Sequence, residues 1–66
     1  MLKKRSFTLS GHRTSVALEA EFWAVIDGAA LREGVSLAAL VARIDAARAD
    51  RPLASALRLY ALANKQ

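Results

Sequence analysis

Residues 13–18, Arg-Thr-Ser-Val-Ala-Leu, have the two-residue alternation of side chains that is typical of a β-strand. No Gly or Pro separates them from the following stretch, which has helical periodicity. In an extended conformation, the two sides of this segment carry different side chains: Thr14, Val16 and Leu18 on one, and Arg13, Ser15 and Ala17 on the other. A lone strand leaves half of its backbone hydrogen bonds unmade, so it needs a partner strand. The rest of the chain offers one weak candidate, and we therefore expect the same strand in a second copy to be the partner.

The weak candidate is residues 6–10, in which Phe7 and Leu9 share one side. Its apolar residues are odd-numbered, whereas those of the 13–18 segment are even-numbered. If both segments are extended, a bulge or a tight bend at Gly11-His12 is needed to shift the apolar positions from odd-numbered to even-numbered residues. Two readings stay open: one long bulged strand, or a separate short segment. Residues 1–5 are expected to fray.

The size of the chain favours association. It has 66 residues, which allow one domain with a small core, yet 55% of it is apolar and it contains no Cys for disulfides. Burial against another copy is the remaining way to hide apolar surface. The sequence contains no run of about 18 apolar residues that could span a membrane, and no signal-peptide core follows the N-terminal basic residues. We expect a cytoplasmic protein with no membrane partner.

The positive charge is concentrated at one end. The net charge is +4, and residues 1–18 hold Lys3, Lys4, Arg5 and Arg13 with no acidic residue, whereas the remainder is balanced. A basic patch on one element indicates a polyanionic partner, most simply a nucleic acid. A solubilising basic tail is the alternative interpretation.

Three helices are predicted after the strand. The first runs from about 20 to 33 and stops at Gly34, and the second runs from about 37 to 48 with Ser36 as its N-cap. The third runs from about 53 to 63 after Pro52. Leu59 and Leu62 lie away from the apolar face of this third helix, which indicates a further contact such as a tetramer or higher assembly.

No catalytic or metal-binding arrangement is visible. His12 is the single histidine and has no second ligand type nearby, no serine has a base at suitable spacing, and the glycines form no phosphate-binding loop. We therefore predict no enzyme activity, no catalytic residues, no cofactor and no metal site.

The string Gly-His-Arg-Thr-Ser-Val-x-Leu-Glu at 11–19, followed by Phe22-Trp23 and the Gly34-Val35-Ser36 turn, resembles the ribbon–helix–helix family of the Arc and MetJ type. It is similar to a subgroup of small ribbon–helix–helix domain proteins. The resemblance implies a mainly α fold with one short β-strand, in which two chains intertwine, share a two-stranded antiparallel ribbon and each add a third helix. The implied dimer core consists of apolar residues of the strand and first two helices: Val16, Leu18, Phe22, Trp23, Ile26, Leu40, Val41 and Ile44.

In that family the ribbon enters the major groove of double-stranded DNA, and the start of the second helix holds a phosphate. By position, Arg13, Ser15 and Ala17 would face the bases and Ser36 would contact a phosphate. Lys3, Lys4, Arg5 and His12 would add phosphate contacts. The resulting hypothesis is a dimeric transcriptional regulator, such as a repressor. The alternative is a homo-oligomerisation or antitoxin-like interaction module without sequence-specific DNA binding.

Overall fold

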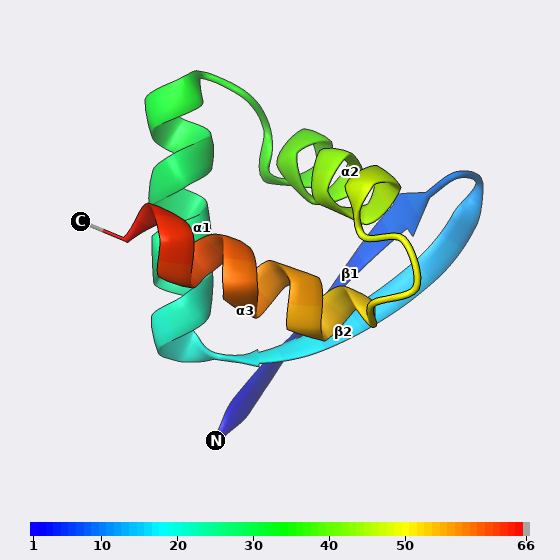
Figure 1. Ribbon diagram of the computed structural model, residues 1–66, viewed down its shortest axis with the longest axis horizontal. Coiled ribbons are helices and arrows are strands. Elements are labelled where there is room, and N and C mark those ends of the chain that lie inside the picture. The colour runs from blue at the N-terminus through cyan, green and yellow to red at the C-terminus, as the bar shows by residue number, and fades with distance from the viewer. Residues whose placement is uncertain (66) are drawn as a thin grey trace.

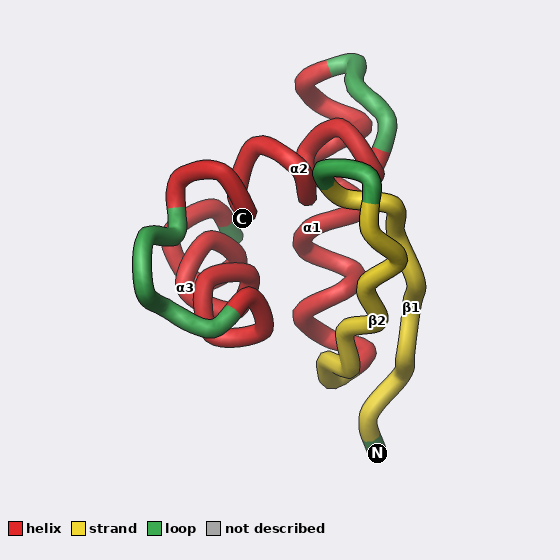
Figure 2. Tube along the Cα trace, turned by 90° about the vertical axis from the view of Figure 1, so that its right-hand side faces the viewer, coloured by secondary structure: helices red, strands yellow, loops and turns green. Residues whose placement is uncertain are grey.

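The chain forms a β-hairpin followed by three helices (Figure 1). The computed structural model describes residues 1–65. The elements are β1 (Leu2–Leu9), β2 (His12–Glu19), α1 (Ala20–Glu33), α2 (Leu37–Ala47) and α3 (Leu53–Asn64). The hairpin lies along one side of the molecule, and the helices lie on its inner side (Figure 2). Within residues 1–65, each helix is too short or too polar to span a membrane.

The partner of β2 is β1 of the same chain. The two strands pair antiparallel over their full length, from Leu9↔His12 at the turn to Leu2↔Glu19 at the open end. The predictions of a single strand per chain and of a frayed segment at 1–5 are therefore wrong. The N-terminal segment is ordered because it pairs with β2 and because its inner side packs on α1.

A two-residue turn joins the strands. Its central residues both have positive φ, 51° at Ser10 and 81° at Gly11, as a type I′ hairpin turn requires. The turn reverses the chain, so the odd-numbered side chains of β1 and the even-numbered ones of β2 share the inner face. The shift of the apolar positions from odd to even numbers therefore arises from a tight bend between two separate strands. One long bulged strand is excluded.

The hydrophobic core is closed within one chain. Its largest fully buried side chains come from β2 and all three helices: Leu18, Trp23, Ile26, Leu40, Val41 and Leu57. Val16 and Ile44 are buried as well, and Phe22 is half-buried against the cluster. Seven of the eight residues expected in a dimer core are thus buried without a second copy. The hairpin and all three helices contribute to this cluster, and α3 adds Ala56, Leu57 and Ala61 to it.

Local signals explain the helix ends. Gly34 is left-handed, and the amides of Gly34 and Val35 donate to the carbonyl oxygens of Leu31 and Ala30, each at 3.1 Å. Ser36 caps α2, since its hydroxyl accepts a 3.0 Å hydrogen bond from the Ala39 amide. These bonds fix the α1–α2 loop, which lies on the same side of the molecule as the hairpin (Figure 2).

Candidate nucleic-acid interface

The solvent-facing side of the hairpin is formed by even-numbered residues of β1 and odd-numbered residues of β2. Its central side chains face each other in three cross-strand pairs, Lys4↔Ala17, Ser6↔Ser15 and Thr8↔Arg13. We call these six residues the outward face. All are exposed except Ala17, which is half-buried. The face is polar and narrow, with one long cationic side chain towards each end.

Two side-chain hydrogen bonds cross the outward face. The Ser6 and Ser15 hydroxyl oxygens are 2.8 Å apart, and Arg13 Nη1 donates to Thr8 Oγ1 at 3.2 Å. The second bond holds the guanidinium of Arg13 across the ribbon. Such a contact restricts the rotamers of a long side chain before it meets a ligand.

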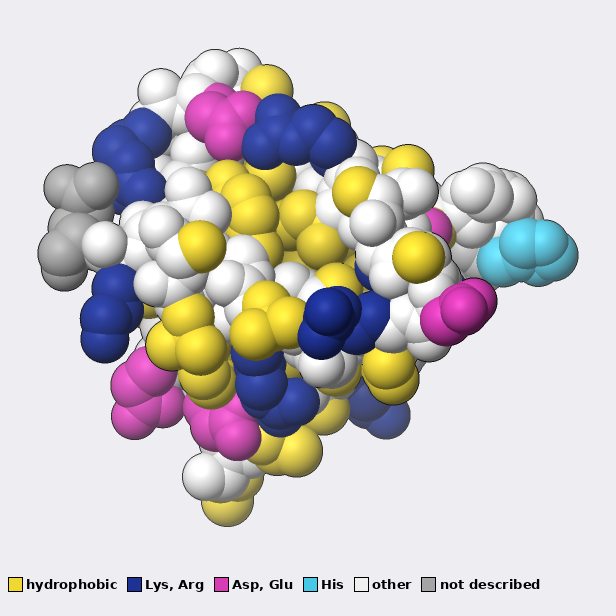
Figure 3. Space-filling model, viewed as in Figure 1, with side chains coloured by type: hydrophobic (Ala, Val, Ile, Leu, Met, Phe, Trp, Pro, Cys, Tyr) yellow, Lys and Arg dark blue, Asp and Glu magenta, His cyan; other side chains and the backbone are white. Residues whose placement is uncertain are grey.

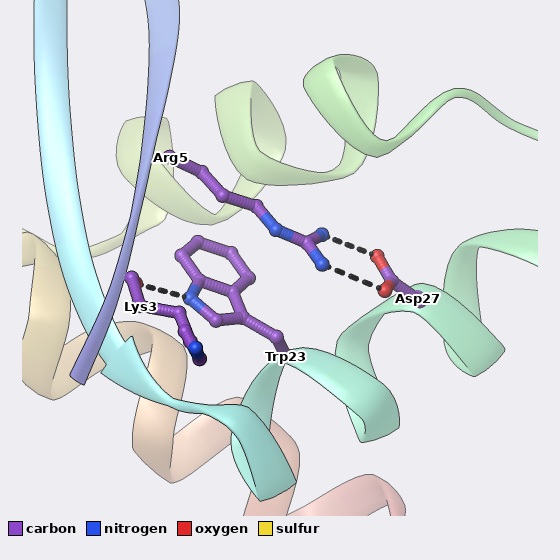
Figure 4. Close-up of polar contacts among 4 residues, drawn as sticks. All are labelled: Lys3, Arg5, Trp23 and Asp27. Atoms are coloured by element: carbon purple, nitrogen blue, oxygen red, sulfur yellow. Dashed lines mark hydrogen bonds and ion pairs between the residues drawn. The ribbon is translucent and has the colours of Figure 1, made fainter. Parts of the chain in front are cut away.

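The N-terminal basic residues do not act as one group, because strand alternation separates them. Lys4 lies on the outward face, whereas Lys3 and Arg5 belong to the inner side. Lys3 is exposed at the open end of the hairpin, and its carbonyl oxygen accepts a 2.7 Å hydrogen bond from Trp23 Nε1. Arg5 is bound to Asp27 of α1 (Figure 4). Only Lys4 of the three points directly away from the body.

The other expected contact residues lie at different places around the ribbon. His12 is exposed beside the turn, where it pairs with Leu9. Ser36 starts α2, and the first-turn amides of Leu37 and Ala38 have no partner within the helix. The structure therefore places Arg13, Ser15 and Ala17 together, whereas Ser36 lies in a separate loop on the same side of the molecule.

The charge of the hairpin is positive along most of its length. In residues 1–65, neither Lys4 nor Arg13 forms an ion pair. The acidic residue at the end of β2 is Glu19, and Arg58 of α3 neutralises it with a 3.0 Å bond. A backbone hydrogen bond at Glu19, followed by the bond from Arg58, lowers the pKa of this carboxyl group. The outward face therefore presents uncompensated positive charge to solvent.

Residues of β1 that sequence reasoning missed now belong to the outward face. The sequence alone predicts that residues 1–5 fray, and it leaves residues 6–10 as either part of one long bulged strand or a separate short segment. It therefore does not place Ser6 and Thr8 on this face. The signal for a hairpin was present: a Ser-Gly dipeptide stands between two alternating segments. No cluster of three or more potential metal ligands occurs within residues 1–65.

A two-stranded antiparallel ribbon, a helix, a Gly-Val-Ser turn and a second helix define a ribbon–helix–helix fold. A family model described as "Ribbon-helix-helix domain" matches residues 2–64, which is almost the whole chain. The chain belongs to this family, and the resemblance noted in its sequence is confirmed. Searches of curated proteins and of solved structures found no match.

Ribbon–helix–helix domains are generally DNA-binding regulators or antitoxins, and typically they are not enzymes. Family membership therefore supports a regulatory role of the DNA-binding type for this chain.

Proposed function

We propose that this protein is a dimeric transcriptional regulator, such as a repressor, that reads the major groove of double-stranded DNA with the outward face of its hairpin. The observation that carries the proposal is the uncompensated pair Arg13 and Lys4 on an exposed, polar, two-stranded ribbon. A two-stranded ribbon fits the width of the major groove, where all four base pairs can be distinguished.

The proposal gives the residues different roles. Arg13 is the guanidinium donor of the outward face, in the pair next to the turn-closing Leu9↔His12 pair, and a guanidinium can donate two hydrogen bonds to guanine O6 and N7. Ser6, Thr8 and Ser15 are short and allow the ribbon backbone to approach the base edges, beside Ala17. Lys3, Lys4 and His12 contact phosphates and fix the register. The free amides at the start of α2, beside Ser36, hold one further phosphate.

The dimer is part of the proposal. A two-stranded sheet leaves the outer-edge backbone groups of both strands without sheet partners, and in residues 2–19 no other element supplies them. We propose that a second copy adds to the hairpin at one of these open edges. Such an arrangement places two basic ribbons side by side. It differs from a ribbon built of one strand from each chain, because each copy already contains its own strand pair.

A second candidate function is an interaction module of the antitoxin type. It is favoured by apolar side chains that α3 leaves in solvent: Leu59 is 45% exposed and Leu62 is 55% exposed. They belong to the helix that lies on the side away from the hairpin, and Figure 3 shows several hydrophobic side chains on that face. In this case α3 binds the partner, and the basic ribbon does not read a DNA sequence.

A mobility-shift titration separates the two functions. The native protein is titrated against the DNA upstream of its own gene and against a random duplex of equal length, at two salt concentrations. Sequence reading predicts tighter binding to one upstream site, with affinity that falls as salt rises. Equal, weak binding to both duplexes would favour the interaction module.

A further inference from the structure

Trp23 and Asp27 lie one helical turn apart on α1 and together bind Arg5 of β1 (Figure 4). Arg5 Nη1 and Nη2 donate to the two carboxylate oxygens of Asp27 at 2.8 and 3.2 Å. The guanidinium carbon lies 4.7 Å from the centroid of the Trp23 ring. One side chain is therefore stacked on an aromatic ring and bonded at two points, a combination that suits the planar fork of arginine.

Trp23 contacts β1 at three alternate positions. Its Nε1 donates to the Lys3 carbonyl oxygen at 2.7 Å, its ring lies beneath Arg5, and its centroid is 6.0 Å from that of Phe7. The indole is only 1% exposed. The inner side of β1 thus rests on a single buried ring over the length of the strand that carries Lys4.

The start of β1 has little else to hold it. Leu2 is half-exposed, Met1 is fully exposed, and Lys4 points into solvent. The remaining attachment is the hydrogen-bonded ladder to β2, which is not stable by itself in a two-stranded ribbon. The contacts of Arg5, Trp23 and Asp27, here called the Trp23 clamp, therefore decide where the first half of β1 lies relative to α1.

We infer that the Trp23 clamp positions the ribbon for DNA, and that Arg5 is a positioning residue rather than a phosphate contact. This inference rests on the proposed function. Arg5 lies on the strand side opposite to Lys4, and its guanidinium is directed towards Asp27 and the Trp23 ring rather than towards the outward face. The clamp instead fixes the direction in which Lys4 and Ser6 project, so its effect on DNA is indirect.

One substitution, Asp27→Asn, changes DNA affinity in opposite directions for a positioning role and for a purely electrostatic role. Asp27→Asn removes a negative charge, so simple electrostatics predicts tighter DNA binding. A positioning role predicts weaker binding, because the clamp loses its ion pair and the start of β1 becomes mobile. Asp50→Asn is the matched control, since Asp50 is exposed in the α2–α3 loop and forms no ion pair within the described residues.

The experiment measures binding of the full chain to its preferred duplex as a function of salt. We expect Asp27→Asn and Arg5→Ala each to weaken binding by about 3- to 10-fold, the range set by a partly exposed ion pair and a cation–π contact. The slope of log affinity against log salt should stay at the native value. The double variant Arg5→Ala, Asp27→Asn should bind DNA no more weakly than Arg5→Ala alone. Asp50→Asn should bind DNA as well as the native chain or slightly more tightly.

The opposite results overturn the inference while leaving the proposed function in place. They are tighter binding by Asp27→Asn, and a salt slope for Arg5→Ala that is flatter by about one unit for each chain bound. Failure of the native chain to prefer any duplex overturns the proposed function and the positioning role with it.

A DNA-free measurement tests the clamp itself. Amide hydrogen exchange at residues 3–5 should accelerate in Asp27→Asn, whereas exchange in α2 should not change. Unchanged exchange at residues 3–5 would show that the ladder alone orders the start of β1, and this would also overturn the inference.

Discussion

Glu33 and Arg43 join the end of α1 to the middle of α2 through two hydrogen bonds, at 2.7 and 2.8 Å. The Tyr60 hydroxyl of α3 donates to the same carboxylate at 3.2 Å, so one acidic group connects all three helices. The hydrogen bonds from Arg43, with a smaller contribution from Tyr60, hold the pKa of the Glu33 carboxyl below its ordinary value.

This lowered pKa predicts a contribution to acid stability. The bonds to ionised Glu33 stabilise the folded chain above the unfolded-state pKa of about 4.3, and the stabilisation is lost as pH falls through the lower folded-state pKa. Glu33→Gln should therefore lower the urea midpoint at pH 7 and show a smaller further decrease on acidification than the native chain. Glu21→Gln is the control, because Glu21 forms no ion pair within residues 1–65. Parallel pH curves for the native chain and Glu33→Gln would contradict the prediction.

The turn offers a stabilising substitution. Ser10 holds a left-handed conformation that costs a residue with a side chain about 1 kcal/mol or more, and Asn tolerates it better before Gly. Ser10→Asn should raise the free energy of unfolding by up to about 1 kcal/mol. Gly11→Ala should lower it by about 1–2 kcal/mol. Beyond the two neighbouring residues, no heavy atom lies within 4 Å of the added methyl group, so this cost is conformational. A stabilising Gly11→Ala would exclude the type I′ turn.

Two leucines of α3 should respond differently to truncation. Leu57 is fully buried, whereas Leu59 is 45% exposed on the same helix. Leu57→Ala should cost about 2–5 kcal/mol in chemical denaturation, because it leaves a cavity in the core that one chain closes. Leu59→Ala should cost about 0.5 kcal/mol or less. Equal decreases in the free energy of unfolding for the two variants would mean that α3 does not pack on the core with Leu57 inward and Leu59 outward.

The exposed side of α3 should govern assembly beyond the proposed dimer. The double variant Leu59→Lys, Leu62→Lys should remain folded by circular dichroism, because neither side chain belongs to the buried core. It should lose any species larger than a dimer in analytical ultracentrifugation, since lysine is costly to bury in an interface. An unchanged distribution of sizes would show that this side of α3 is not an interface.

The helices could be predicted from sequence because each has an independent local signal. Gly34 stops α1, Ser36 caps α2, and Pro52 precedes α3. The first half of β1 could not be predicted, because its inner face carries Lys3 and Arg5 where an apolar residue would be expected. Arg5 can occupy such a position because its guanidinium stacks on Trp23 and binds Asp27. Arg5 and Asp27 are 22 residues apart in the sequence, so their ion pair produces no periodic pattern from which it could be predicted.

The candidate site was predictable on one strand only. Alternation in residues 13–18 was sufficient to put Arg13, Ser15 and Ala17 on the solvent side, where the structure has them. The opposing residues Ser6 and Thr8 depend on the register of the hairpin, and a turn with Ser at its first left-handed position is a weak signal. The role of Lys4 also depends on register, because a shift of one residue would exchange it with Arg5.

The central claim, that Arg13 reads sequence from the outward face, is tested most directly by the ratio of affinities for a selected site and for random duplex. The site is obtained by selection from a random duplex library with the native protein, and Lys4→Ala serves as the matched loss of charge. Arg13→Ala should cost about 1–3 kcal/mol on the selected site and little on random duplex, so the ratio shrinks. Lys4→Ala should weaken both duplexes alike and leave the ratio unchanged. If Arg13→Ala instead weakens all duplexes equally, the ribbon does not read bases through Arg13 and the claim is contradicted.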